Sequence, residues 1–204
     1  MEVYFIRHGA TKGNQEHRYV GRTDEAILVS EQEKLRNLGA KIGQVNHVFT
    51  SPYLRCIQSA NALFGATEAN AEQDHETEGR FEIVSDFREM DFGAFEYKNY
   101  QELNGNPHYQ KFIDSGGTIA FPEGEEPEAF KARCIRAFEI CMKKAYDQKW
   151  EKVAFVVHGG TIMAILERYG LPKQGYFEYQ VKNGSGFSGE IIQGKYIQYQ
   201  RLQN

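Results

Sequence analysis

The chain has 204 residues, of which 41% are hydrophobic and 25% charged, and its formal net charge is −4. This length suits one sizeable α/β domain, and the composition excludes a disordered or fibrous protein. No lysine- or arginine-rich block occurs and no apolar run is long enough to cross a bilayer, so neither nucleic acid nor a membrane is expected as a partner. Three cysteines without a CxxC pair, and a first segment too short and too acidic for a signal peptide, favour a reduced, cytoplasmic protein.

The first predicted strand, residues 3–6, is apolar and ends in Arg7-His8-Gly9. A second apolar run near the other end of the chain, residues 153–157, ends in the same way in His158-Gly159-Gly160. In open α/β sheets, ligands bind beyond the carboxyl ends of the strands. If the two strands are neighbours, both histidines point into one crevice, and this pair is the centre of the predicted site.

Between these two strands the pattern alternates between helices and strands. A capping box of Ser30 and Glu33 predicts a helix that starts at Ser30, and Ser51 with Pro52 predicts the start of another. The expected elements, in chain order, are a functional loop over 9–24, a helix over 30–42, a strand over 48–51, a helix over 51–64, a polar surface connection over 66–80 and a strand over 81–87.

Residues 93–123 are rich in aromatic residues, Gly and Pro, and are too irregular for the sheet. We expect two short helices there, near Tyr100 and Tyr109, and a lid over the strand ends. We call residues 93–123 the lid segment. The elements expected after it are helices over 126–146 and 161–169 and edge strands over 177–181, 189–192 and 196–201. No linker divides the chain, so a single domain over 1–204 is predicted.

Arg55 lies in the first turn of the helix predicted over 51–64, where the helix dipole disfavours a cation. An anion held between the arginine and the helix terminus accounts for this position. The alternative is a solvated surface arginine, which is common. Because this strand–helix junction is of the same kind as the two that present the histidines, we favour the anion site.

The charged groups expected at strand ends are Arg7, His8, Arg55, Glu89 and His158. Guanidinium groups match the oxygens of phosphate or carboxylate, and one nearby carboxylate can move a proton. There is no GxxxxGK[ST] phosphate loop and no G-x-S-x-G nucleophile turn. Two histidines and a glutamate could also bind zinc, but two arginines beside a dication are unfavourable, so no metal is expected.

The order of motifs resembles that of a known family. The run Arg7–Asn14 resembles its RHGxTxxN signature, and the similarity continues through residues 19–24, 51–60, 88–96 and 157–162. On these motifs the chain is identified as a member of the histidine phosphatase superfamily, also called phosphoglycerate mutase-like. The resemblance implies a three-layer α/β/α sandwich with a mostly parallel central sheet and a small lid insertion.

The resemblance also implies roles for individual residues. His8 would be a nucleophile that forms a phosphohistidine, and Glu89 would protonate the leaving oxygen and then activate water. The implied phosphate contacts are Arg7, Arg55, His158 and Asn14. Candidate substrate contacts are Gly21, Arg22 and Gly159. No cofactor is implied, and we expect His8 to be neutral and His158 to be protonated.

Two features place the chain within the superfamily. The segment between Glu89 and His158 is short compared with that of the cofactor-dependent glycerate mutases, and Phe121–Glu125 followed by Arg133 resembles the P-x-G-E…R pattern of the smaller phosphatases. The α-ribazole phosphatase branch is the most similar, although Phe95-Glu96-Tyr97 replaces its usual Trp-Glu-Gly.

The expected activity is therefore that of a phosphomonoesterase on a small phosphorylated metabolite such as α-ribazole-5′-phosphate. The alternatives are a phosphoglycerate mutase, a broad-specificity sugar or nucleotide phosphatase, and a protein that binds a phosphorylated ligand without turnover. Intact His8 and Glu89 argue against the last of these. The oligomeric state, monomer or dimer, stays open.

Overall fold

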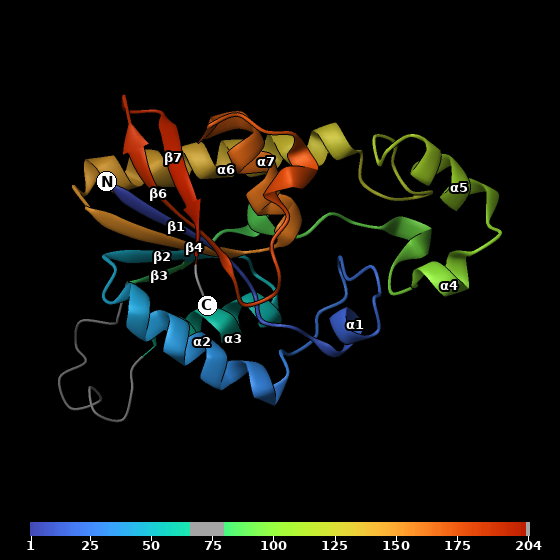
Figure 1. Cartoon of the computed structure of the whole chain (residues 1–204), viewed down its shortest axis with the longest axis horizontal. Helices are drawn as coiled ribbons and strands as arrows, with labels where there is room; N and C mark the ends of the chain where they lie inside the picture. The colour runs from blue at the N-terminus through green and yellow to red at the C-terminus, as the bar shows by residue number, and fades with distance from the viewer. Residues whose placement is uncertain (66–79, 203–204) are drawn as a thin grey trace.

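The computed structural model describes residues 1–65 and 80–202, so the predicted connection over 66–80 lies almost wholly outside the described residues. Within them, one sheet has the strand order β3-β2-β4-β1-β6-β7-β5 (Figure 1). The strands are β1 (Glu2–Arg7), β2 (His47–Thr50), β3 (Phe81–Ile83), β4 (Lys152–Val157), β5 (Gly170–Leu171), β6 (Gly186–Ile192) and β7 (Tyr196–Arg201).

The two strands that carry the His-Gly motifs are neighbours, as predicted. β1 pairs with β4 in parallel, with Arg7 opposite Val157, so both strands end at the same edge of the sheet. β2 continues the parallel arrangement on the far side of β4, and β3 follows β2. β6 pairs antiparallel with β1, and β7 antiparallel with β6.

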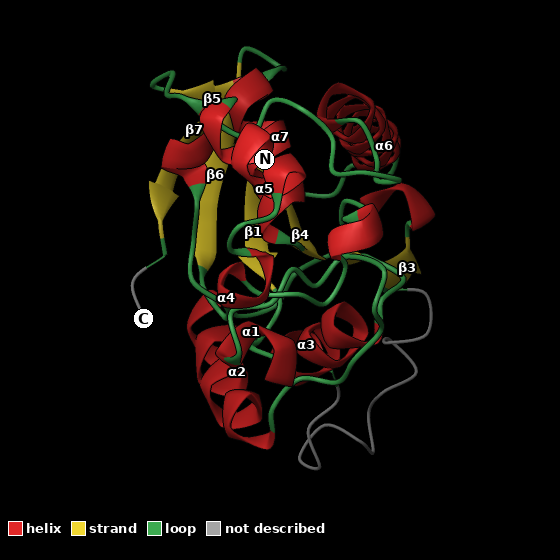
Figure 2. Ribbon diagram, turned by 90° about the vertical axis from the view of Figure 1, so that its right-hand side faces the viewer, coloured by secondary structure: helices red, strands yellow, loops and turns green. Residues whose placement is uncertain are grey.

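Helices cover both faces of the sheet, which confirms the three-layer α/β/α architecture. Figure 2 shows α2 and α3 on one side and α6 and α7 on the other, while α4 and α5 lie beyond the end of the sheet in the lid segment (Figure 1). The helices are α1 (Lys12–Gln15), α2 (Val29–Ile42), α3 (Leu54–Phe64), α4 (Tyr100–Leu103), α5 (Pro107–Asp114), α6 (Pro127–Asp147) and α7 (Gly159–Tyr169).

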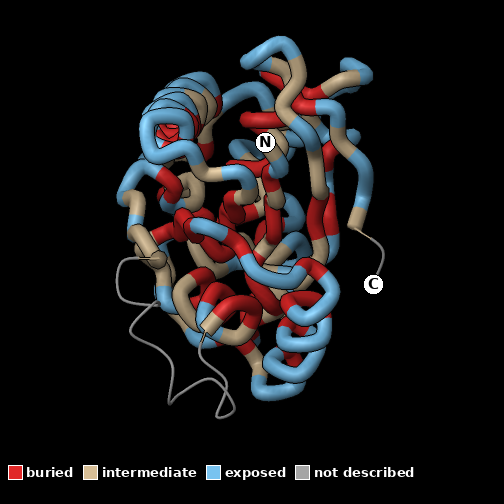
Figure 3. Tube along the Cα trace, turned by 90° about the vertical axis from the view of Figure 1, so that its left-hand side faces the viewer, coloured by how far each residue is buried: buried red, intermediate tan, exposed pale blue. Residues whose placement is uncertain are grey.

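Alternation along the central strands feeds two apolar cores. Phe5 of β1 and Phe155 of β4 are fully buried on the side of α6 and α7, and their rings stack with centroids 5.3 Å apart. Ile6 and Val156 point to the opposite side, into the core formed with α2 and α3. Burying each such side chain stabilises the fold by about 1.5–3 kcal/mol. Figure 3 shows the resulting buried interior and the exposed outer turns of the helices.

Both predicted helix starts need correction. α2 begins at Val29 after Leu28, and no side chain caps it, so the box of Ser30 and Glu33 does not form. α3 begins at Leu54, three residues later than predicted. Its N-cap position is held by Tyr53, without a side-chain cap, and the hydroxyl of Ser51 instead contacts a histidine in the site described below. The loop predicted over 9–24 contains α1, which has its own capping box of Thr11 and Asn14.

Two predicted strands are partly or wholly wrong. β3 ends at Ile83, and a 3₁₀ turn over Ser85–Phe87 follows it. The turn places the side chain of Phe87 in the core formed with α6 and α7. The segment predicted as a strand over 177–181 instead begins with a 3₁₀ turn, Tyr176–Tyr179. That turn buries Tyr179 and exposes Phe177, two side chains that a strand would place on one face.

The lid segment contains its two short helices, α4 and α5, where they were expected. Its aromatic side chains form a small core of their own with Tyr19. No helix in residues 1–65 or 80–202 is long and apolar enough to cross a membrane. The single domain over 1–204 stays a prediction.

Candidate active site

His8 and His158 meet at the carboxyl ends of β1 and β4. Their ring centroids are 5.2 Å apart and their planes are tilted by 67°, so the edge of one ring faces the other. Both side chains are buried, with 3% and 0% of their surface exposed. The crevice predicted from the two His-Gly motifs is therefore present.

The hydrogen bond of His8 defines which of its nitrogens can react. Nδ1 lies 2.8 Å from the carbonyl oxygen of Gly9, and a carbonyl can only accept, so Nδ1 carries the proton. Nε2 then holds the free lone pair. Burial, and after it the charges of Arg55 and Arg7, hold the pKa of His8 well below its ordinary value. His8 is thus a neutral imidazole with a free Nε2, as a nucleophile requires.

His158 forms a hydrogen bond with a residue that lies just before the start of α3. Its Nε2 lies 2.7 Å from the hydroxyl of Ser51. Burial, followed by the charge of Arg55, lowers the pKa of His158 well below the usual range. The expectation that His158 is protonated is therefore wrong for the protein alone. A phosphate dianion beside the ring would raise its pKa, since an opposite charge favours the protonated form.

Arg7 and Arg55 each use part of their guanidinium group within the protein. Arg7 Nη1 donates to the carbonyl of Val181 at 2.9 Å, and Arg55 donates to the carbonyls of Thr23 and Gly21 at 2.7 and 2.8 Å. The Nε atoms of both arginines are buried and have no partner among the described residues. Because buried N–H donors in proteins are almost always bonded, these two point to an anionic ligand beside His8.

Asn14 stands at the edge of this group. Its Oδ1 accepts hydrogen bonds from the Thr11 N–H at 3.2 Å and from Asn183 Nδ2 at 3.1 Å. This fixes the orientation of the amide and leaves Nδ2 as a donor. Asn183 also donates to the carbonyl of His8 at 3.2 Å, so it ties α1 to the end of β1.

Glu89 lies against the first turn of α7. Its Oε1 accepts from the Met90 N–H at 2.9 Å, and its carboxyl also receives a hydrogen bond from the backbone of Gly160. Burial of the carboxyl is the main cause of a raised pKa for Glu89, opposed by these hydrogen bonds and by the two arginines. A carboxyl group with a raised pKa can hold a proton closer to neutral pH, which suits an acid catalyst.

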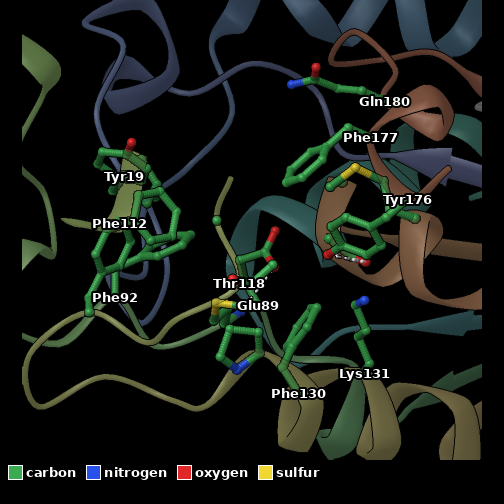
Figure 4. Close-up of a pocket in the computed structure, with 18 of the residues that line it drawn as sticks. Tyr19, Glu89, Phe92, Phe112, Thr118, Phe130, Lys131, Tyr176, Phe177 and Gln180 are labelled. Carbon is green, nitrogen blue, oxygen red and sulfur yellow. Dashed lines mark hydrogen bonds between the residues drawn. The ribbon is translucent and has the colours of Figure 1, made fainter. Parts of the chain in front are cut away.

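Arg7, His8, Asn14 and Glu89 line a cavity of about 530 Å³, whereas Arg55 and His158 are fully buried and are not among its lining residues. Tyr19, Phe92 and Phe112 stand on one side, and Tyr176 and Phe177 on the opposite side, with Glu89 between them (Figure 4). From the lid segment, the cavity lining includes Phe112, Gly116, Gly117, Thr118 and Phe121. Together with Tyr19 and Phe92, the lid segment forms one aromatic side of the cavity.

Of the three candidate substrate contacts, one lines the cavity and two do not. Gly159 lines the cavity, but Gly21 and Arg22 are not among its lining residues. Arg22 pairs with Asp91 at 3.2 Å on the surface. Gly21 has a structural reason, since a Cβ there would lie 2.3 Å from the carbonyl oxygen of Met90. As substrate contacts, Gly21 and Arg22 stay predictions.

Several lining or supporting residues were not predicted from the sequence. They are Ser51, Lys131, Tyr176, Phe177 and Asn183. The position of Lys131 at the start of the helix after the lid segment offered a signal. Asn183 offered none, because only the fold brings it to His8.

The zinc alternative finds no support in the part of the chain that the structure describes. No group of three or more His, Cys, Asp or Glu side chains within residues 1–65 and 80–202 is arranged to hold a metal ion. The histidines and Glu89 instead have separate backbone or hydroxyl partners.

A buried neutral histidine at the end of a central strand, beside unpaired guanidinium donors, defines an anion-handling α/β enzyme of the phosphoglycerate mutase-like kind. The chain belongs to the histidine phosphatase superfamily (branch 1), whose family model matches residues 3–196. This confirms the resemblance drawn from the motifs.

Individual relatives are distant. The chain is 25% identical to phosphoglycerate mutase-like protein 4 of Arabidopsis thaliana, over 82% of this chain and 70% of that protein. It is 23% identical to the "Probable phosphoglycerate mutase GpmB" of Enterobacter sp. (strain 638), over 91% and 82%.

Solved structures share the fold. The α-ribazole phosphatase from Shigella flexneri superposes with a TM-score of 0.80 at 20% identity, covering 100% of this chain and 96% of that one. A phosphoglycerate mutase from Thermus thermophilus gives a TM-score of 0.69 at 23% identity, covering 100% and 99%.

Proposed function

We propose that this protein hydrolyses phosphomonoesters through a phosphohistidine at His8 and without a metal ion. The observation that carries the proposal is the neutral His8 with its free Nε2, next to two buried guanidinium Nε atoms that lack partners. A protein that only binds phosphate needs the arginines but has no use for a nucleophile with this hydrogen bond.

In the first step, Nε2 of His8 attacks phosphorus and the bond to the leaving oxygen breaks, while Glu89 gives its proton to that oxygen. In the second step, Glu89 takes a proton from water as the water oxygen attacks phosphorus. The P–N bond then breaks, releasing inorganic phosphate and regenerating neutral His8. Arg7, Arg55 and His158 stabilise the charge on the phosphoryl oxygens, which is the main requirement of this reaction.

The aromatic sides of the cavity favour a leaving alcohol that carries a ring. We propose α-ribazole-5′-phosphate as the substrate, supported by the similar fold of the Shigella flexneri α-ribazole phosphatase. The runner-up is phosphoglycerate mutase activity, which the names of the Arabidopsis and Enterobacter relatives favour.

The test is phosphate release from a panel of phosphorylated metabolites, together with trapping of the enzyme by a ³²P-labelled phosphomonoester. We expect an acid-labile, base-stable phosphoprotein and activity that survives exhaustive treatment with chelators. Loss of activity that zinc or manganese restores would replace this mechanism with a metal-dependent one.

A further inference from the structure

The cations that line the cavity differ in whether a carboxylate neutralises them. Arg18 lies 2.5 Å from Glu16 and 2.7 Å from Glu102, so both carboxylates neutralise it. Lys131 is likewise paired with two carboxylates of its own, described next. Among the described cations that line the cavity, only the guanidinium of Arg7 has no carboxylate within 4 Å. The described lining therefore offers one cation that is not neutralised, which suits one anionic group.

Away from Arg7, the cavity has a charged side built from α6 and α7. Lys131 Nζ lies 3.3 Å from Glu128 and 3.0 Å from Glu167, and we call these three residues the α6–α7 wall. Two carboxylates against one ammonium leave this wall with one net negative charge. All three residues line the cavity, and Figure 4 shows Lys131 and Tyr176 on the same side of it.

Tyr176 stands beside this wall, with Lys131 Nζ 4.5 Å from the centre of its ring. Burial is the main cause of the raised pKa of Tyr176, and the carboxylates of Glu89 and Glu167 add to it. A second anion placed here would face the carboxylates of Glu128 and Glu167, which Lys131 neutralises only in part.

We infer that the α6–α7 wall disfavours substrates whose alcohol carries a negative charge, and prefers phosphomonoesters of uncharged or cationic ring-bearing alcohols. The inference rests on the proposed function, because it treats the cavity as the place of the leaving alcohol. It sets phosphorylated acids apart from the favoured substrates by charge, independently of size. Two like charges about 8 Å apart near a protein surface imply a discrimination of roughly 3- to 30-fold.

The test compares three para-substituted ligands of similar size by calorimetric binding: 4-carbamoylbenzylphosphonate, which is neutral at the para position, 4-(aminomethyl)benzylphosphonate and 4-carboxybenzylphosphonate. These phosphonates do not turn over, so the result is independent of catalysis. We expect the carboxylate to bind roughly 3- to 30-fold more weakly than the neutral ligand, and the amine to bind at least as well as the neutral one.

Charge variants of the wall then assign the effect. Glu167→Gln should narrow the gap between the carboxylate and the neutral ligand, and Lys131→Met should widen it. Glu167 carries the test because Glu128 is largely exposed and its charge is more strongly screened. The matched control is Asp147→Asn, which also removes one negative charge, but from an exposed ion pair with Lys143 at the far end of α6. It should leave the three affinities in the same ratio.

Equal affinities for the neutral and carboxylate ligands would overturn the inference and leave the phosphatase proposal intact. They would direct attention to a neighbouring groove lined by His17 and Lys182. Failure of all three ligands to bind would also overturn it, because the wall would then face no ligand. Failure of the proposed function shows separately, as absence of phosphate release from every phosphomonoester.

Discussion

Hydrogen-bond partners, rather than burial, separate the roles of the two histidines. Both rings are buried and both have lowered pKa values. His8 donates from Nδ1 to a carbonyl, which leaves a lone pair on Nε2, whereas His158 Nε2 is already engaged by the hydroxyl of Ser51. Only His8 is arranged as a nucleophile, and this leads to the first prediction.

Replacing His8 with Ala should reduce phosphate release by roughly three orders of magnitude or more, because the attacking atom is lost. The variant should also fail to take up label from a ³²P phosphomonoester. His158→Ala is the informative comparison, since it removes a phosphate contact but keeps the nucleophile, and it should still label, although slowly. Normal turnover by His8→Ala would contradict the mechanism.

The role proposed for Glu89 can be tested by the dependence of the rate on the leaving group and on pH. An alkyl alcohol needs a proton to leave and an aryl alcohol hardly does, so Glu89→Gln should slow alkyl phosphates by roughly 10²- to 10⁴-fold and aryl phosphates far less. Because burial raises the pKa of Glu89, its proton should be lost, and kcat/KM for alkyl phosphates should fall, as pH rises through a value above that of an ordinary glutamate.

The acid limb has a different origin. The lowered pKa of His8 keeps it neutral in mildly acidic solution, so activity should fall only as pH drops through a value below that of an ordinary histidine. Comparing the wild-type enzyme and Glu89→Gln on the same substrate cancels the titration of the phosphate group itself. A basic limb that Glu89→Gln leaves unchanged would show that another group supplies the proton.

Two adjacent glycines provide a third test at the scale of single residues. A Cβ on Gly160 would lie 2.6 Å from Glu89 Oε1 and 2.9 Å from the ring of Phe130, whereas one on Gly159 would make only an ordinary contact with Arg7 at 3.5 Å. Gly160→Ala should displace the carboxylate and cost roughly 100-fold in kcat, chiefly on alkyl phosphates. Gly159→Ala should cost much less, and equal losses in the two variants would refute this account of Gly160.

At the scale of elements, one ion pair ties α6 to the segment that carries Glu89. Arg133 donates to both oxygens of Glu125, at 2.6 and 2.7 Å, and to the carbonyls of Asp86 and Arg88 at 2.7 Å each. It also donates to the carbonyl of Glu89 at 3.1 Å. The P-x-G-E…R pattern of the sequence therefore corresponds to a bidentate ion pair, with Arg133 buried and Glu125 partly buried, beside the segment that carries Glu89.

Arg133→Met should lower the free energy of unfolding by about 3–5 kcal/mol, because it leaves the partly buried Glu125 without a partner and three carbonyls without a donor. Urea unfolding followed by circular dichroism measures this. The double variant Arg133→Met with Glu125→Met should recover part of the loss, since it removes the unpaired charge as well. A double variant less stable than the single one would show that packing, and not the pair, dominates.

The elements also show how far sequence patterns reach. The neighbouring strands β1 and β4 follow from their apolar runs, and α6 from its long amphipathic period, because both signals are dictated by the core. The segment predicted as a strand over 177–181 forms a 3₁₀ turn, Tyr176–Tyr179, and only its end, with Tyr179 and Val181 buried around an exposed Gln180, alternates as a strand does. The capping box at Ser30 failed because the chain enters α2 one residue earlier, at Val29.

Within the site, predictability followed the motifs. Arg7, His8 and His158 sit at strand ends, and parallel pairing alone brings them together. Ser51 lies in a motif that the sequence marks, but its contact with His158 follows only from the packing of distant segments, and nothing local in the sequence marks Asn183. Residues that support a site from elsewhere in the fold need the structure to be found.

At the scale of the whole molecule, the question is whether water reaches the phosphoenzyme. A mutase must keep its phosphohistidine from water while the intermediate re-orients, and it must also hold a carboxylate. Here one side of the cavity is the aromatic lid segment, and Arg7 is the only lining cation without a carboxylate partner among the described residues. The single unpaired cation and the aromatic side of the cavity therefore suit a substrate with one phosphoryl group and a ring.

We therefore expect net phosphatase activity that is greater on nucleoside-like monophosphates than on 3-phosphoglycerate, with no dependence on 2,3-bisphosphoglycerate. A coupled mutase assay and a phosphate-release assay on one preparation measure both activities, and Glu89→Gln provides the control for contaminating enzymes. A carboxylate-bearing substrate finds no second unpaired cation on the described lining, so isomerisation should stay below hydrolysis. Isomerisation that bisphosphoglycerate stimulates, and that outruns phosphate release, would make the protein a mutase and leave only its membership of the superfamily unchanged.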